Sequence, residues 1–271
     1  MSVHLPEIYT VAIKAAIEAS VAILKVYKQD FKAMTKKDGS AVTEADLLSS
    51  EIIAKALETT NIPILGEELE KDAFSIRQHW TENWCVDPLD GTKMFVRKND
   101  EFCVNIAHVV GGNPAFGIIA APVEQTLLVG GPLIGSYHFQ FDQLSKPEEW
   151  KRLTSSPQSG QEVRIVGSRS YREECGRDHV SRYIKSYQTV EYLYRASALK
   201  FFNLALNEAQ IYPRFAPTME WDIAAGQAIL EALGGRVIDV QTGTPLTYNK
   251  ESLYNPHFIA ITEATWYFAE D

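Results

Sequence analysis

The chain has 271 residues, of which 45% are hydrophobic and 23% charged, and this composition is ordinary for a globular protein. Its net charge of -9 argues against partners such as bulk nucleic acid or an anionic membrane. It does not exclude a small anionic ligand, because bound metal ions can reverse a local field. Three widely spaced cysteines, Cys85, Cys103 and Cys175, indicate free thiols in a reducing compartment. No apolar run approaches the roughly 18 residues of a spanning helix, so we expect no integral membrane contact.

The first part of the chain predicts two helices separated by a basic turn. Apolar residues recur at steps of three and four across residues 7–28, after Pro6. Residues 36–40, which include two lysines, form either a solvated loop or a mobile flap that approaches a phosphate. The second helix covers residues 43–57, and its start, Thr43-x-x-Asp46, matches a capping box. Capping alone would therefore explain Asp46.

Two adjacent glutamates follow a short apolar strand at residues 62–65, in the sequence Gly66-Glu67-Glu68. Side chains alternate along an extended segment, so one of the two carboxylates is expected to point inward. An inward carboxylate needs a cation nearby. This strand and a second one that ends at Val86 are predicted neighbours, joined by a polar excursion over residues 69–83.

A second acidic motif, Asp87-Pro88-Leu89-Asp90-Gly91-Thr92, comes directly after Val86. Proline fixes its own φ and lacks an N–H, so we expect the strand to stop before Pro88 and both aspartates to lie on one rigid turn. Carboxylates beside the backbone N–H groups of Gly91 and Thr92 suit a phosphate bridged by Mg²⁺. The alternative is a capped turn whose acids only stabilise a helix start. The order Asp-Gly-Thr excludes the Asp-Thr-Gly motif of aspartic proteases.

The remaining elements divide into two kinds. Residues 102–141 predict an antiparallel meander of four strands. Residues 142–161 are polar and contain two prolines, so we place the boundary between an N-terminal lobe, 1–150, and a C-terminal lobe, 151–271, in this stretch. Strands and helices alternate in the second lobe and predict an α/β arrangement. The strands are expected at 163–167, 190–194, 211–213, 236–240 and 258–261, and the helices at 171–184, 197–207 and 221–233.

Trp221-Asp222 is a third acidic site, at the predicted start of a helix. An acid at this position is stabilised by the helix dipole, which is one explanation for Asp222. The other explanation is a metal ligand that the second lobe delivers to the site formed by the first.

The acidic motifs, taken together, resemble those of the inositol monophosphatase superfamily, whose marks are GEE, DPxDGT and a late WD before a helix. The closer resemblance is to the CysQ-type 3'(2'),5'-bisphosphate nucleotidases. It rests on five stretches and covers about residues 36–260. They are Val42–Asp46, Ile64–Glu68, Asp87–Lys93, Val166–Ser170 and Tyr212–Gly226, the last of which reads YPRFAPTMEWDIAAG.

This resemblance implies an αβαβα layered sandwich with an antiparallel-sheet lobe, an α/β lobe and the active site between them. It also implies two or three Mg²⁺ ions held by Glu67, Asp87, the Leu89 carbonyl, Asp90 and Asp222. The catalytic residues would be Asp46, Thr92 and Glu67, of which Asp46 and Thr92 would position and deprotonate the attacking water. The substrate-binding residues would be Glu67, Leu89, Asp90, Gly91, Thr92, Ser168, Arg169, Lys200, Arg214 and Asp222. Lys200, Arg169 and Arg214, candidates for a second phosphate, are alternatively salt-bridge residues.

The implied reaction is removal of the 3'-phosphate of adenosine 3',5'-bisphosphate, as in sulfur assimilation, with inhibition by lithium. The alternatives are hydrolysis of inositol monophosphate or a sugar bisphosphate by the same superfamily, or a non-catalytic sensor of metal and phosphonucleotide. The expected partner is a phosphorylated nucleotide and not nucleic acid. We expect a monomer or homodimer in the cytoplasm, with peripheral contact at the inner membrane as an open alternative.

Three positions depart from the pattern of the nucleotidase branch. Met94 replaces a glutamate just beyond the metal ligands, Tyr171 replaces a histidine, and Ala198 replaces a serine. None of them is a predicted metal ligand, so they bear on substrate preference more than on the reaction.

Overall fold

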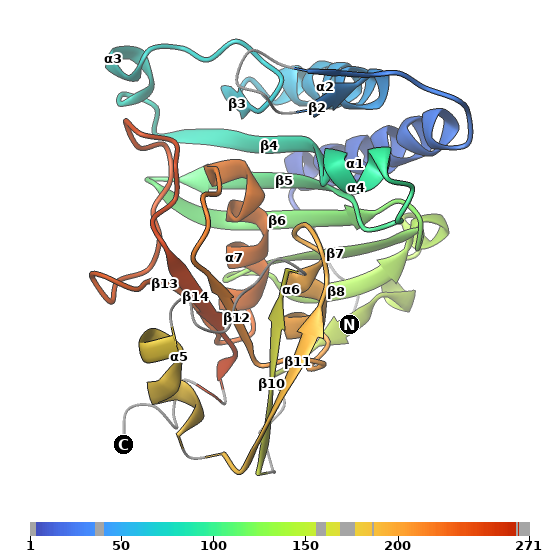
Figure 1. The fold of residues 1–271 in the computed structure, drawn as a ribbon. Coiled ribbons are helices and arrows are strands. Elements are labelled where there is room, and N and C mark those ends of the chain that lie inside the picture. The colour runs from blue at the N-terminus through green and yellow to red at the C-terminus, as the bar shows by residue number, and fades with distance from the viewer. Residues whose placement is uncertain are drawn as a thin grey trace.

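The computed structural model describes residues 4–35, 41–155, 161–168, 177–185, 187–263 and 265. These residues form two large β-sheets and a separate two-stranded one, and helices pack outside and between the large sheets to give five layers (Figure 1). The predicted αβαβα sandwich is therefore confirmed. Among the described residues, no helix is both long enough and apolar enough to cross a membrane.

The first layer consists of the helices α1 (Glu7–Tyr27) and α2 (Glu44–Leu57), as predicted from the apolar spacing. Their buried faces, which include Ile13 and Ile53, pack on one face of the larger sheet. The predicted capping box at the start of α2 is present, because the Asp46 carboxylate accepts a bond from the Thr43 N–H.

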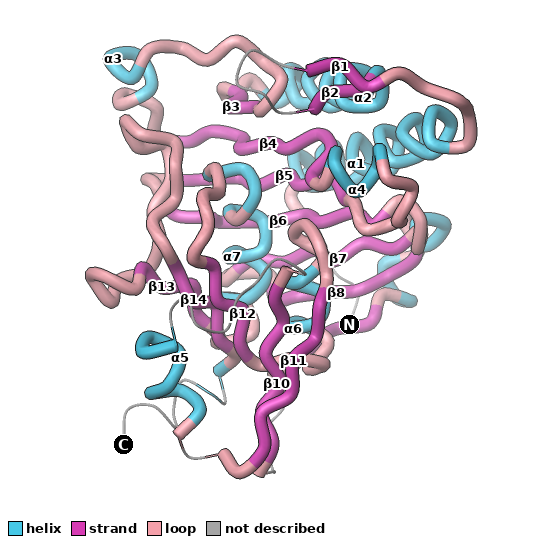
Figure 2. The backbone as a smooth tube through the Cα atoms, in the orientation of Figure 1, coloured by secondary structure: helices cyan, strands magenta, loops and turns pink. Residues whose placement is uncertain are grey.

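The larger sheet is the second layer and contains seven strands in the order β3-β4-β5-β6-β7-β8-β9 (Figure 2). Strands β3 and β4 are parallel, and each later pair is antiparallel, which confirms the predicted meander. The strands are β3 (Ile64–Gly66), β4 (Glu82–Asp90), β5 (Cys103–Val110), β6 (Asn113–Ala121), β7 (Thr126–Gly131), β8 (Gly135–Gln140) and β9 (Lys151–Leu153). The shorter elements around them are β1 (Ala33–Thr35), β2 (Ala41–Thr43), η1 (Glu58–Thr60), α3 (Phe74–Arg77), α4 (Thr92–Val96), η2 (Phe141–Gln143) and η3 (Pro147–Glu149).

Strand β4 continues through Pro88 to Asp90, so the expectation that it stops before the proline is wrong. On one side, pairing with β3 ends at Val86, and Pro88 has no strand partner there. On the other side, the register with β5 shifts between Asp87 and Asp90, which is a bulge. The missing N–H of Pro88 therefore interrupts no ladder hydrogen bond, and the bulge turns the two aspartates away from the regular pleat.

The middle layer contains α6 (Lys200–Ala205) and α7 (Ala224–Glu231), which lie between the two sheets. Close approach to the larger sheet requires a glycine on β6, since a Cβ at Gly117 would lie 2.1 Å from the Ala225 carbonyl oxygen. The sequence predicted longer helices here. The one expected to start at residue 221 instead begins with a separate 3₁₀ turn, η4 (Glu220–Asp222), because the backbone of Ile223, at φ -126° and ψ -33°, leaves the α-helical path.

The smaller sheet is the fourth layer, with the strand order β11-β10-β12-β14-β13. Strands β11, β10 and β12 are parallel, and β14 runs antiparallel to both of its neighbours, β12 and β13. They are β10 (Glu162–Gly167), β11 (Thr189–Tyr194), β12 (Ile211–Arg214), β13 (Arg236–Asp239) and β14 (Phe258–Ile261). The fifth layer is α5 (Arg177–Ile184), whose Val180 and Tyr183 pack on the outer face of this sheet. Residues 171–176 of the helix expected there lie outside the described residues, and the lobe division at residue 150 stays a prediction.

Candidate active site

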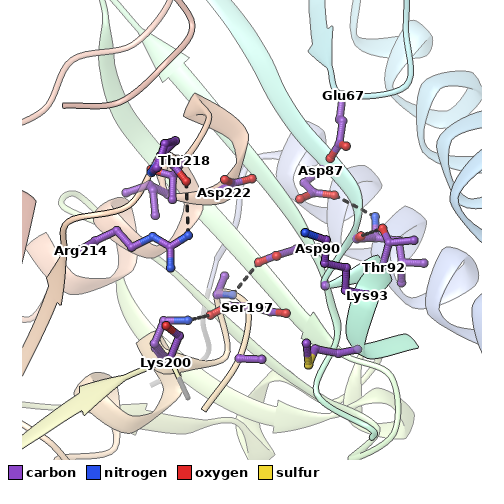
Figure 3. A pocket seen from close by; sticks show the side chains of 18 of the residues that line it. Glu67, Asp87, Asp90, Thr92, Lys93, Ser197, Lys200, Arg214, Thr218 and Asp222 are labelled. Carbon is purple, nitrogen blue, oxygen red and sulfur yellow. Dashed lines mark hydrogen bonds between the residues drawn. The ribbon is translucent and has the colours of Figure 1, made fainter. Parts of the chain in front are cut away.

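Four of the five predicted acidic residues, Glu67, Asp87, Asp90 and Asp222, line one pocket of about 440 Å³, although they lie far apart in the chain (Figure 3). Asp46 lies behind the lining, where it bonds Thr92. The pocket lies where the end of β4, α4 and the turn after β3 meet η4, β12 and the residues before α6. Of the predicted site residues, it is lined by Glu67, Asp87, Leu89, Asp90, Gly91, Thr92, Ser168, Lys200, Arg214 and Asp222. Arg169, the basic turn at residues 36–40 and Tyr171 lie outside the described residues.

The β4 bulge sets the positions of Asp87 and Asp90. The Asp87 carboxylate accepts a hydrogen bond of 3.0 Å from the Leu89 N–H, which holds it over the bulge. Asp90 receives bonds from two other segments, at 2.6 Å from the Ala198 N–H and at 3.2 Å from the Asn105 side-chain amide. Hydrogen bonds from the protein itself thus orient each carboxylate before any ligand binds.

The other two carboxylates arrive from opposite sides of the pocket. Glu67 follows β3, and its N–H donates to the Val86 carbonyl at 3.0 Å. Asp222 ends the 3₁₀ turn η4, where its carboxylate accepts a bond of 2.9 Å from the Met219 N–H. Figure 3 shows Glu67, Asp87 and Asp222 directed toward a common space.

Burial and mutual repulsion raise the pKa of the three aspartates Asp87, Asp90 and Asp222. Burial is the largest cause of a pKa of Asp87 well above the usual range, followed by the charges of Glu67, Asp90 and Asp222. Burial, followed by the charge of Asp90, raises the pKa of Asp222 to about 8. The pKa of Asp90 is also raised by burial, although the Lys200 ammonium opposes this. A cation among the carboxylates would restore their ionised forms.

The donor set therefore fits a hard divalent cation. Carboxylate and carbonyl oxygens are the ligands that Mg²⁺ prefers, and the four acids and the Leu89 carbonyl supply them. Across the described part of the chain, no group of three histidine, cysteine, aspartate or glutamate side chains is arranged to hold a metal ion. The four acids line the pocket from separate elements.

Asp46 caps α2 with one carboxylate oxygen and bonds Thr92 with the other. One carboxylate oxygen, Oδ2, caps α2 through the N–H and hydroxyl of Thr43, at 2.6 and 2.7 Å. The other, Oδ1, accepts a hydrogen bond of 2.8 Å from the Thr92 hydroxyl. Burial raises the pKa of Asp46, and the bonds from Thr43 and Thr92 partly offset this. Capping therefore holds the carboxylate in place and leaves one oxygen for Thr92.

Two basic side chains line the same pocket as these acids. Lys200 is 3% exposed, and its ammonium donates to the Ser197 carbonyl at 2.6 Å. Burial lowers its pKa to about 8, while the charge of Asp90 acts in the opposite direction. Arg214 donates to the Pro217 carbonyl at 3.3 Å, and its buried Nε has no hydrogen-bond partner among the described atoms. Both cations line the pocket, so an anion bound there could contact either of them.

The sequence did not reveal two groups that support Asp90. Asn105 lies opposite Asp87 in the β5 register, and its polar side chain within an apolar strand was the available signal. Ala198 was considered only for the hydroxyl that it lacks, yet its backbone N–H bonds Asp90. No sequence pattern identifies a backbone donor of this kind. Lys93 and Met94 also line the pocket.

The comparisons with known proteins agree with this geometry. A family model described as the inositol monophosphatase family matches residues 4–266. The chain is 37% identical over 248 residues to the 3'(2'),5'-bisphosphate nucleotidase CysQ of Salmonella typhimurium, covering 90% of this chain and 95% of the relative. It is also similar to the crystal structure of CysQ from Bacteroides thetaiotaomicron, with a TM-score of 0.80 and 36% identity over 93% of this chain and 96% of that one.

A more distant solved structure shares the fold alone. It is an IMPase/NADP phosphatase complexed with Mg²⁺ and phosphate, with a TM-score of 0.71 and 17% identity over 93% of this chain and 90% of that one. The family model and the nucleotidase relatives each extend over most of the sequence. The chain therefore belongs to the inositol monophosphatase family.

Proposed function

We propose that this chain is a Mg²⁺-dependent 3'(2'),5'-bisphosphate nucleotidase, which converts adenosine 3',5'-bisphosphate to AMP and phosphate. The observation that carries the proposal is a single pocket lined by four carboxylates together with the two cations Lys200 and Arg214. A substrate with two phosphates matches both sets of residues, because one phosphate would share cations with the acids and the other would meet the basic residues. The similarity to CysQ nucleotidases supports the same substrate class.

In this proposal, Glu67, Asp87, the Leu89 carbonyl, Asp90 and Asp222 hold two or three Mg²⁺ ions. Bound Mg²⁺ lowers the pKa of a coordinated water and offsets the charge that develops on the leaving oxygen. The protein contributes ligands that are already oriented by hydrogen bonds from Leu89, Ala198 and Met219. Preorganised ligands of this kind do not need to rearrange at the moment of reaction.

Thr92 and Asp46 orient the attacking water. The Thr92 hydroxyl donates a hydrogen bond of 2.8 Å to Asp46, so a lone pair of its oxygen is available to accept a proton of that water as its own proton passes to Asp46. Asp46, with its raised pKa, then takes up the proton that passes through Thr92. Glu67, which lines the same pocket, is the third proposed catalytic residue.

Lys200, Arg214, Ser168 and Arg169 would bind the second phosphate, and the backbone at Gly91 and Thr92 the reacting one. An anion beside Lys200 raises the pKa of its ammonium and keeps it charged, which offsets the effect of burial. The unpartnered Nε of Arg214 would gain an acceptor. The division into lobes at residue 150, a monomeric or homodimeric state and a cytoplasmic location belong to this proposal as well.

Phosphate release from two substrates tests the assignment. Adenosine 3',5'-bisphosphate should be hydrolysed with kcat/KM at least about tenfold above that for inositol 1-phosphate, since its second phosphate adds at least one charge-assisted hydrogen bond of about 1.5 kcal/mol. Both reactions should require Mg²⁺. Faster hydrolysis of inositol 1-phosphate would instead assign the chain to the monophosphatase or sugar-bisphosphatase branches.

Asp90→Asn separates an enzyme from a sensor. The amide oxygen can still accept the Ala198 N–H, so the fold should be kept while a charged metal ligand is lost. We expect phosphate release to fall by about two to three orders of magnitude, to near background. Asp142→Asn, at an exposed position, is the matched control and should leave the rate unchanged. A parent protein without Mg²⁺-dependent turnover would support the sensor and contradict the proposal.

Thr92→Val tests the proton path. Valine has nearly the same shape but lacks the hydroxyl that bonds Asp46, so kcat should fall about a hundredfold with little change in KM. Thr92→Ser keeps the hydroxyl and should retain most of the activity. Steady-state kinetics with adenosine 3',5'-bisphosphate measure both variants, and equal kcat values for valine and serine would exclude Thr92 from the path.

A further inference from the structure

We propose that Lys71 is a positioning residue that fixes the Glu67 turn against the Trp221–Asp222 turn and so sets the spacing of two proposed metal ligands. These ligands come from opposite halves of the chain, and neither the β4 bulge nor the hydrogen bond to Asp222 joins them directly. The inference rests on the proposed Mg²⁺ function, and it concerns how the protein shapes the site before a metal binds.

Lys71 fixes the backbone at Glu67. Its ammonium donates to the carbonyl oxygens of Glu67 and Leu69, at 2.7 and 2.9 Å. The N–H of Glu67 is bonded to the Val86 carbonyl at 3.0 Å. Both polar groups of the Glu67 residue backbone are therefore held, one by the larger sheet and one by Lys71, which restricts rotation of the carboxylate toward or away from the pocket.

The same ammonium contacts the other half of the site. It lies 5.1 Å from the centre of the Trp221 ring, within the range of a cation–π interaction. Trp221 is only 4% exposed and belongs to the core between the sheets, so it is a rigid surface. Asp222 is the next residue. One side chain thus connects the backbone that carries Glu67 with the turn that carries Asp222.

A second connection between the same segments lies farther from the pocket. Arg77, which is 3% exposed, donates to the Asn249 side chain at 2.8 Å and to the Lys250 carbonyl at 3.2 Å. The N–H groups of Asn249 and Lys250 in turn donate to the Glu220 carboxylate, at 2.7 and 3.0 Å. Glu220 is fully buried and begins the η4 turn. Residues 67–77 are therefore joined to this turn at two points, which define both distance and orientation.

Metal affinity distinguishes positioning from a simple effect of charge. If Lys71 acted only as a positive charge near the acids, its removal would favour a cation, and Mg²⁺ would bind more tightly. If Lys71 positions the ligands, its removal lets the two carboxylates drift apart, and Mg²⁺ binds more weakly. The two explanations therefore predict opposite signs.

The test is calorimetric titration of the full chain with Mg²⁺ alone, without substrate. Lys71→Met keeps the aliphatic stem at an exposed position, so the variant should fold. We expect its Kd for Mg²⁺ to rise about fivefold to tenfold, as when a group that orients metal ligands is lost. Lys71→Arg keeps a cation for the Trp221 ring and a donor for the carbonyls, and it should restore most of the affinity.

Lys98→Met is the matched control. Like Lys71, Lys98 combines cation–π contacts with hydrogen bonds to backbone carbonyls. Its ammonium lies 4.4 Å from the centre of the Tyr27 ring and 4.5 Å from that of Phe31, and it donates to the Tyr27 and Gln29 carbonyls. These partners lie at or just after the end of α1 and not in the turns that carry Glu67 and Asp222, so the loss of Lys98 should lower the Tm without changing the Kd for Mg²⁺.

Two results would overturn the inference. Unchanged or tighter Mg²⁺ binding by Lys71→Met, with a parent that binds normally, would reject the role of Lys71 and leave the proposed function intact. A parent that binds no Mg²⁺ would reject the proposed function and the inference together.

Discussion

Repulsion among carboxyl groups in one buried pocket is the constraint on which the rest of this structure depends. Burial raises the pKa of Asp87 and Asp222, and the neighbouring acids raise it further, to about 8 for Asp222. Groups of this kind would separate into solvent if their segments were free to move. The bulge of β4, the 3₁₀ turn η4 and the backbone N–H groups of Leu89, Ala198 and Met219 hold them instead.

The five layers explain how such distant residues meet. The larger sheet presents the end of β4 at one wall of the pocket, and the middle helical layer brings the residues before α6 and the start of α7 to the opposite wall (Figures 1 and 3). Close packing makes this placement stiff, since a Cβ at Gly117 would collide with the Ala225 carbonyl. A stiff frame keeps like charges close, and a cation then stabilises the folded state by binding them.

The sequence predicted the parts of the site that depend on residue type and local spacing. Asp87 and Asp90 were predicted because two carboxylates directly follow an apolar strand. The capping box was predicted from the four residues Thr43 to Asp46. The path of β4 past Pro88 was not predictable, because it depends on β3 ending at Val86 and on a register shift against β5. The contact of Lys71 with Trp221 and the bond from Ala198 to Asp90 arise only when the two halves pack together.

The central claim is that these carboxylates form one site for divalent cations. Crystals soaked in Mn²⁺, which shares the oxygen-ligand preference of Mg²⁺ and scatters anomalously, test it most directly. The account predicts anomalous peaks among Glu67, Asp87, Asp90 and Asp222, at about 2.0–2.6 Å from their oxygens. An empty pocket at saturating Mn²⁺, or peaks bound only elsewhere on the protein, would contradict it.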